Sequence, residues 1–186
     1  MGASRALYVV RVLAVLLSVA FPYGLAARGG RVARADPPVP VSRPVTDAAG
    51  VLGGRRGQVD RAVARLRAVH GVRLYVVYVK DFSGLSAQEW ASQAALRSHL
   101  GRLDLLLAFS VGERRYAVSA DSRFPLSSGE LDAVAATVIE PALRHGDWAG
   151  AAIGAAEEYG ATLAERGKIH AADRPGGGPG GGPGVA

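Results

Sequence analysis

Residues 72–80 read VRLYVVYVK, and this stretch decides the fold class. Nearly every position is apolar and most residues are β-branched or aromatic, which is typical of a strand covered on both faces of its sheet. Residues 104–111, DLLLAFSV, show the same pattern and predict a second buried strand. Residues 115–120, RYAVSA, follow the turn sequence GER and predict a third strand, antiparallel to the second.

Amphipathic segments around these strands predict the helices that cover the sheet. Residues 55–70 carry apolar side chains at helical spacing and end before a glycine, a common helix stop. Ser86 with Glu89, and Ser127 with Glu130, form the Ser-x-x-Glu pattern of a capping box, so we expect helices to begin there. The side chains expected to face the core are Val59, Val63, Leu66 and Val69 in the first helix, Trp90 and Ala94 in the second, and Leu131, Val134 and Val138 in the third.

Pro141 is expected to bend the third helix, because proline cannot lie inside a helix without cost. Beyond the bend, Asp147 is expected to cap a last helix with one broad apolar face. A strand, a helix and a second strand in succession imply a right-handed parallel crossover. The sequence therefore predicts an α/β fold, a three-layer α/β/α sandwich with a small mixed sheet. On the last helix, the larger side chains expected to face the core are Trp148, Tyr159 and Leu163. Its small residues are expected to allow close packing on the sheet, and they are Ala151, Ala152, Gly154 and Ala155.

The two ends of the chain differ in composition from this body. Residues 1–35 contain the apolar run VLAVLLSVA and end in Ala-Arg-Ala, so we interpret them as a signal peptide, with an uncleaved N-terminal anchor as the alternative. Either interpretation places the domain outside the cytoplasmic membrane. The remaining parts are a proline-rich, extended linker at 36–44, the domain at 45–166, and a glycine- and proline-rich tail at 167–186 that is expected to be disordered.

The positive charge of the chain is concentrated in its leader. The formal net charge is +6, but five arginines lie before residue 36 in a stretch without an acidic residue. The rest of the chain has 17 basic and 16 acidic side chains, so its composition does not indicate a nucleic-acid-binding surface. The sequence has no cysteine, which excludes thiol catalysis, disulfide bonds and thiolate metal sites.

Arg144-His145-Gly146 is the tripeptide that opens the active site of histidine phosphatases. In those enzymes it follows the first strand of the domain, whereas here it follows a predicted helix and a proline. The residue types also suit a helix boundary: basic side chains complement the carbonyl end of a helix, and glycine adopts the left-handed stop. We therefore interpret the tripeptide as a join between two helices and His145 as incidental.

In their order and spacing, these features resemble the TPM domain family over about residues 45–163. The resemblance is carried by VTDAAGVL at 45–52, by VRLYVVYVK with the following Ser83-Gly84, by Gly101 and Asp104 before LLLAF, and by IEPALRHGDWAGA at 139–151. It implies an extracytoplasmic α/β/α sandwich. Weak acid phosphatase activity and calcium binding belong to some members of the family, and most have no assigned activity.

Three aspartates are the candidate metal ligands. Asp47 and Asp104 match acidic positions near the cleft of the family, and Asp81 follows the first predicted strand, where α/β sheets bind ligands. Carboxylates are ligands that Ca²⁺ prefers, so calcium is the one cofactor we consider. Each of the first two residues also has a structural interpretation, Asp47 as a turn residue and Asp104 as a side chain that orders the loop before its strand. A shared calcium site requires Asp47 and Asp104 to lie close together.

Two functional hypotheses follow from the sequence. The first is an exported cell-envelope module without enzymatic activity that binds or modulates an envelope or membrane protein and contacts the membrane itself only through an uncleaved N-terminal segment. The second is a weak metal-assisted acid phosphatase, in which aspartates hold a cation that polarises a phosphoryl oxygen. Common phosphatase chemistry based on histidine or cysteine is missing, so the first hypothesis ranks higher.

Overall fold

The computed structural model describes residues 7–9, 38 and 40–172, with side chains for residues 38 and 40–167. These residues form a five-stranded mixed sheet in the order β1-β5-β4-β3-β2. The strands β2, β3 and β4 are parallel, whereas β5 is antiparallel to both β4 and β1. The strands are β1 (Leu7–Val9), β2 (Val45–Asp47), β3 (Arg73–Val79), β4 (Asp104–Ser110) and β5 (Arg115–Asp121).

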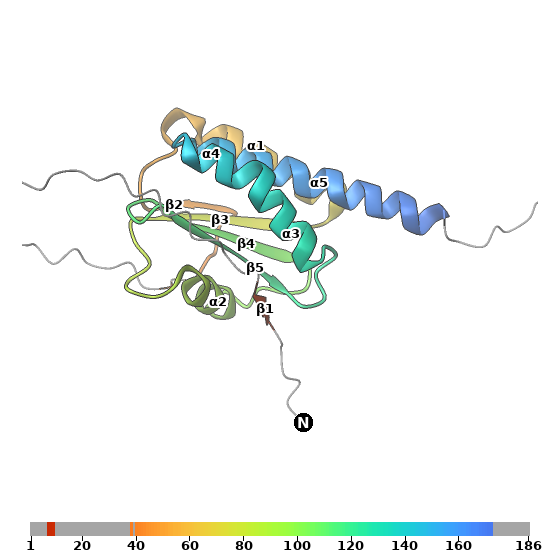
Figure 1. The fold of residues 1–186 in the computed structure, drawn as a ribbon, viewed down its shortest axis with the longest axis horizontal. Coiled ribbons are helices and arrows are strands. Elements are labelled where there is room, and N and C mark those ends of the chain that lie inside the picture. The colour runs from red at the N-terminus through yellow and green to blue at the C-terminus, as the bar shows by residue number, and fades with distance from the viewer. Residues whose placement is uncertain (1–6, 10–37, 39, 173–186) are drawn as a thin grey trace, which may run out of the picture.

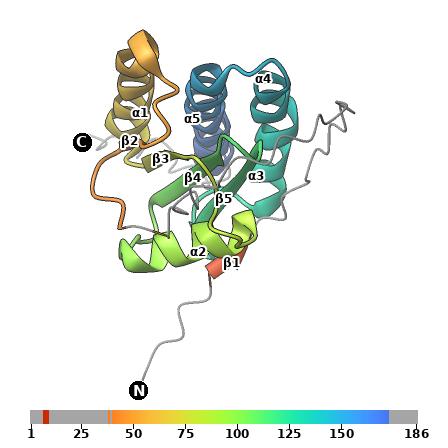
Figure 2. The same ribbon diagram turned by 90° about the vertical axis from the view of Figure 1, so that its left-hand side faces the viewer.

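Helices cover both faces of this sheet, as the side view in Figure 2 shows. One face carries α2 alone, and the other carries α1, α5 and the helical segment made of α3, η2 and α4. The predicted three-layer α/β/α sandwich with a small mixed sheet is therefore confirmed. The helices are η1 (Gly53–Arg55), α1 (Arg56–His70), α2 (Ala87–Arg97), α3 (Ser128–Val134), η2 (Ala135–Ile139), α4 (Glu140–Arg144) and α5 (Trp148–Ala172).

The three strands predicted from the sequence lie where they were expected, and β4 is buried along its whole length. Two strands were not predicted. β2 is a three-residue edge strand that pairs with β3, and β1 is a segment of the expected leader that pairs with β5. Both are too short to produce a recognisable alternation in the sequence.

The two predicted capping boxes are confirmed. The Ser86 hydroxyl accepts a hydrogen bond from the Glu89 N–H at 3.2 Å, and the Glu89 carboxylate accepts the Ser86 N–H at 3.0 Å. Ser127 and Glu130 form the same reciprocal pair at the start of α3. Satisfying these otherwise unpaired donors fixes the residue at which each helix begins.

The core faces of the helices agree with the sequence prediction except at Val69. Val59, Val63 and Leu66 of α1 are buried, but the Val69 side chain is 67% exposed, so its assignment to the core was wrong. Val69 lies ten residues after Val59, about 80° around the helix from it at 100° per residue, and it is in the last turn of α1.

Pro141 is accommodated by a π-helical turn rather than by a sharp bend. The segment Ala135–Ile139 is π-helical, and the Glu140 N–H donates to the Ala135 carbonyl in the i to i−5 pattern. Pro141 then occupies the first turn of α4, where its missing N–H does no harm. The helical segment therefore continues through the proline, and Ile139 remains fully buried.

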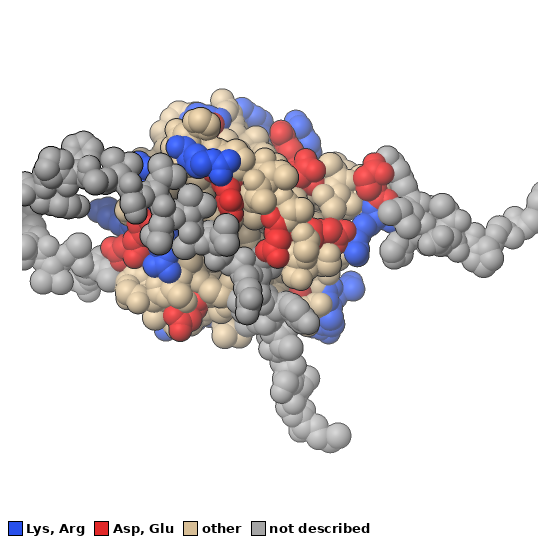
Figure 3. Space-filling view, in the orientation of Figure 1, with Lys and Arg blue, Asp and Glu red and all other residues tan. Residues whose placement is uncertain are grey.

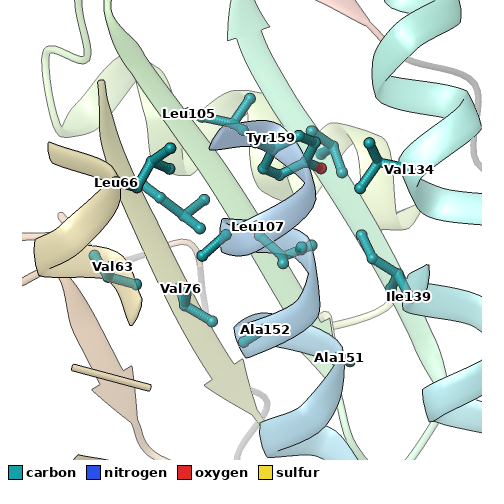
Figure 4. Packing of buried hydrophobic residues seen from close by; sticks show 14 of the residues in the cluster. Val63, Leu66, Val76, Leu105, Leu107, Val134, Ile139, Ala151, Ala152 and Tyr159 are labelled. Atoms are coloured by element: carbon teal, nitrogen blue, oxygen red, sulfur yellow. The ribbon is translucent and has the colours of Figure 1, made fainter. Parts of the chain in front are cut away.

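The last helix, α5, packs closely because its buried side chains are small. Figure 4 shows α5 lying over the sheet between α1 and the α3–η2 segment, with Ala151 and Ala152 towards the strands. A Cβ atom on Gly154 would lie 2.5 Å from a methyl carbon of Val138, so only glycine permits this contact between α5 and η2. α5 continues to Ala172, past the domain end expected at residue 166; residues 173–186 of the expected tail lie outside the described residues.

The expected linker 36–44 is anchored to the domain. The Arg97 guanidinium donates to the Pro38 carbonyl at 3.0 Å, and the Val41 N–H donates to the Ser98 hydroxyl at 2.7 Å. Val41 is buried in the smaller core between α2 and the sheet. The chain therefore reaches the domain along the carboxyl-terminal end of α2.

Candidate functional site

The carboxyl ends of the three parallel strands define one edge of the sheet, which we call the carboxyl edge. Ligands of open α/β sheets bind at this edge because the loops that follow the strands meet there. Here it carries the loops after β2, β3 and β4, together with residues 145–147 between α4 and α5. The opposite edge, where β3 and β4 begin, is the amino edge.

Asp47 ends β2 at the carboxyl edge and holds the following turn. Its carboxylate accepts the backbone N–H groups of Gly50 at 2.8 Å, Val51 at 3.1 Å and Leu52 at 3.0 Å. Gly50 has a φ of +72°, a conformation that side-chain-bearing residues rarely adopt. The turn interpretation of Asp47 is thus the one its hydrogen bonds support.

Asp147 connects this turn to α5. Its carboxylate accepts the Gly150 N–H at 2.7 Å, which confirms the predicted cap, and it also forms an ion pair with Arg55. A Cβ atom on Gly150 would collide with that carboxylate, so the cap requires glycine at this position. Loops that lie 92 residues apart in the sequence are joined in this way.

An aromatic cluster lies beneath these charged groups. The Tyr78 hydroxyl donates to the Trp148 carbonyl at 3.0 Å, and the Phe109 ring stacks on Tyr78 with a centroid separation of 5.0 Å. The Trp148 ring meets Phe109 edge-on at 6.0 Å. Burial, with the carboxylates of Asp47 and Asp147 nearby, raises the pKa of the Tyr78 hydroxyl, so Tyr78 remains a neutral hydrogen-bond donor.

Asp81 and Glu113 lie in the other two loops of the carboxyl edge. Asp81 accepts the Ser83 N–H at 2.9 Å, in a turn where Ser83 has a φ of +60°. Glu113 accepts the Phe82 N–H at 3.1 Å and the Ser110 hydroxyl at 2.7 Å, and so ties the loop after β3 to the end of β4. The carboxylates of this edge therefore shape its loops.

Asp104 lies at the amino edge, away from the other two candidates. Its buried carboxylate pairs with both ends of the Arg73 guanidinium at 2.5 and 2.7 Å and accepts the Gly101 N–H at 2.7 Å. Asp104 is in register with Arg73, whereas Asp47 is in register with Tyr78. Five residues of strand, about 17 Å, separate the two positions, so the structure does not bring Asp47 and Asp104 together.

Arg144-His145-Gly146 forms the helix boundary that the sequence indicated. Arg144 ends α4, the Gly146 N–H donates to the Leu143 carbonyl at 3.0 Å, and Gly146 has a φ of +71°. All three residues are exposed. The described part of the chain holds no cluster of three or more histidine, aspartate and glutamate side chains arranged to bind a metal ion.

Several residues of this site escaped the sequence analysis. Arg55 was assigned to a helix, Tyr78 to a buried strand, and Glu113 to a turn, and nothing in the spacing of these residues indicates that they meet. Asp147 was found, but only as a helix cap. The one available signal was that charged residues follow strand ends.

The fold and the carboxyl edge define a class: a small α/β/α domain whose parallel strands end in charged, hydrogen-bonded loops. The TPM domain family matches residues 45–162 of the chain, which therefore belongs to this family. The resemblance inferred from the sequence is confirmed.

Comparison with individual proteins agrees with this assignment. The chain is 45% identical over 149 residues to UPF0603 protein Rv2345 of Mycobacterium tuberculosis; the aligned part is 79% of this chain and 22% of the length of that relative. The fold is similar to that of the N-terminal domain of cg2496 from Corynebacterium glutamicum, with a TM-score of 0.58, 24% identity and coverage of 76% of this chain and 88% of the other. An N-terminal domain from P. gingivalis gives a TM-score of 0.62 at 21% identity, over 72% of this chain and 94% of the other.

Proposed function

We propose that this TPM domain is an extracytoplasmic binding module without enzymatic activity, which recognises an envelope or membrane protein through its carboxyl edge. Its expected leader supports the location, whether it is a cleaved signal peptide or an anchor. No helix of the described residues is long and apolar enough to cross a membrane.

The observation that carries this proposal is the hydrogen bonding of the carboxyl-edge carboxylates. The Asp47 carboxylate accepts three backbone N–H groups. The Asp147 carboxylate accepts the Gly150 N–H and pairs with Arg55, and the Glu113 carboxylate accepts the Phe82 N–H and the Ser110 hydroxyl. A carboxylate that acts as nucleophile, general base or metal ligand must offer a lone pair to its target, whereas these carboxylates accept hydrogen bonds that hold the loops in one shape. Loops fixed on a rigid sheet are typical of a recognition surface.

The face shown in Figure 3, which lies beside the carboxyl edge, carries interspersed acidic and basic side chains without a large area of one sign. Such a face does not favour general attraction to polyanions or cations.

The proposal is tested by affinity capture from envelope extracts with the full chain. Ala48 is exposed in the loop after β2, and Ala48→Arg places a bulky charge on the carboxyl edge. Ala68→Arg is the matched control, because Ala68 is exposed near the end of α1 at the amino edge. We expect a reproducible partner with the native chain and with Ala68→Arg, and its loss with Ala48→Arg. Equal capture by both variants, or no reproducible partner, contradicts the proposal.

A second candidate function, metal-assisted phosphatase activity with calcium, is favoured by one observation. Asp47, Asp81 and Glu113 come from three different loops of the same edge. They form no metal-binding cluster in the described structure, so a cation would have to draw them together at the edge where parallel sheets bind ligands. It would have to compete with the backbone donors that these carboxylates now accept.

Phosphomonoester hydrolysis separates the two functions. An Asp47→Asn, Asp81→Asn double variant should abolish a genuine calcium-dependent activity, whereas Asp104→Asn at the amino edge should retain it. Phosphomonoester hydrolysis that is unchanged in the double variant, or that does not respond to added calcium, contradicts the phosphatase function.

A further inference from the structure

The edge of β5 is suited to accept another strand. β5 reads RYAVSAD, and its five interior residues include no charge and no proline. Natural sheets protect exposed edges with charged residues, prolines or bulges, because an unprotected edge pairs with other chains. β5 shows none of these devices between its two ends, and it lies outermost among the strands formed by residues 40–172.

In the structure this edge is occupied by β1. Leu7 is in register with Asp121, Tyr8 with Ala120 and Val9 with Ser119, in an antiparallel arrangement. Figures 1 and 2 show β1 as a separate short strand beside β5, near α2. β1 belongs to the segment that the sequence identifies as a leader, so the strand on this edge does not come from the TPM domain itself.

A pocket of about 400 Å³ lies at the end of β5, next to the position of Leu7 in the register. The buried side chains of Phe124, Leu126 and Leu131 line it together with the polar residues Asp121, Ser122 and Arg166. Two of its charges are already paired, since Arg166 forms an ion pair with Glu130 and Asp121 forms one with Arg123. The pocket therefore suits an uncharged or apolar side chain.

We propose that the β5 edge and this pocket together form a binding groove for an extended apolar segment of another polypeptide. The segment pairs antiparallel to β5 through main-chain hydrogen bonds. The pocket lies beside Asp121, and in the antiparallel register the residue opposite Asp121 is the first of the added strand. The residues that precede the added strand in its own chain are therefore the ones that would reach the pocket. Main-chain pairing gives affinity in such complexes, and the side-chain pocket gives specificity.

Residues 7–9 are then an internal competitor for the groove. A tethered segment competes at an effective concentration of roughly millimolar, so the full chain binds an external segment weakly. Removal or displacement of the leader opens the groove. This surface is separate from the carboxyl edge, because the pocket and the end of β5 lie at the amino edge.

The test uses full chains and a labelled peptide that repeats residues 3–13, ASRALYVVRVL. Tyr8→Pro places a proline, which strands tolerate poorly, at the middle of the three-residue strand β1 and should detach it. Val19→Pro changes the same leader outside the paired segment and is the control. Fluorescence anisotropy should show at least about tenfold tighter peptide binding by the Tyr8→Pro chain than by the native chain or the control. A peptide carrying Tyr8→Pro should not bind.

Hydrogen exchange tests the pairing, and a pocket variant tests the pocket. Amides of Arg115–Asp121 should exchange faster in the Tyr8→Pro chain than in the native chain, and the native peptide should restore their protection. Ser122→Trp, added to the Tyr8→Pro chain, fills the pocket entrance and should weaken peptide binding at least about fivefold, whereas Ala68→Trp should not.

Three results would overturn the proposal. The first is a hydrogen-exchange rate of the β5 amides that is the same in the native and Tyr8→Pro chains. The second is equal binding of the native and the proline peptide. The third is a Tyr8→Pro chain that dimerises without binding the peptide, because the edge would then pair with a second copy of itself. Loss of the Ala48-dependent partner described above leaves all three measurements unaffected.

Discussion

Replacement of Asp47 by alanine should destabilise the domain, because three backbone N–H groups lose their acceptor. Hydrogen bonds to a charged group contribute about 1.5–3 kcal/mol each. Gly50 is exposed and can bond to water instead, so the cost arises mainly at Val51 and Leu52. We expect a loss of about 3 kcal/mol, which corresponds to a melting temperature lower by roughly 6–12 °C for a chain of this size.

Asp47→Asn is the informative companion to this variant. Its amide oxygen can still accept the two N–H groups that Asp47 Oδ1 accepts, but its NH₂ group would face the Leu52 N–H that Oδ2 now accepts. We therefore expect about half of the loss seen with alanine, roughly 1.5 kcal/mol.

The assay is thermal and urea unfolding with and without calcium. If Asp47→Ala melts within about 2 °C of the native chain, the turn does not depend on the carboxylate and the reasoning fails. A rise in the melting temperature of the native chain with calcium, absent in both Asp47 variants, would show instead that the carboxylate binds the cation.

Three further predictions concern packing and pairing. Gly150→Ala should displace the Asp147 carboxylate from the start of α5 and cost about 1–2 kcal/mol in urea unfolding, and an unchanged midpoint would contradict the role of this cap. The buried Tyr159 hydroxyl has no hydrogen-bond partner among the described residues, so Tyr159→Phe should leave stability unchanged or raise it by up to about 1 kcal/mol. Tyr78→Phe removes the hydrogen bond to the Trp148 carbonyl and should lower stability by about 1 kcal/mol. Equal effects of the two variants on the free energy of unfolding would refute this difference. Arg73→Ala leaves a buried carboxylate without its cation and should cost about 3 kcal/mol, which a denaturation midpoint close to that of the native chain would disprove.

The fold was largely predictable because its signals are local. Apolar runs identified β3, β4 and β5, and two capping boxes located the starts of α2 and α3. β1 and β2 were missed because a strand of three residues owes its existence to a neighbour in the sheet and not to its own pattern. Val69 was misassigned because a stripe of apolar residues drifts around a helix, and the pattern alone does not show where burial ends.

The site was less predictable, since its contacts join distant segments. Sequence could give Asp47 two interpretations, and its hydrogen bonds decide between them only once the turn is seen. A shared calcium site would require Asp47 and Asp104 to lie close together, and they lie apart because one ends a strand and the other begins one. The contact between Arg55 and Asp147 forms because α1 and α5 start at the same edge of the sheet. That arrangement is a property of the topology, and no sequence motif indicates it.

The places where the chain enters and leaves the domain determine how a tether would orient it. The chain enters beside the end of α2, where Pro38 and Val41 are bound, and α5 leaves past the sheet at the edge where Arg166 contacts Pro125 (Figure 1). Both passages lie at the amino edge. A tether attached at either end would therefore act as a stalk, with the loops of Asp47, Asp81 and Glu113 at the far tip, facing away from whatever surface holds the protein.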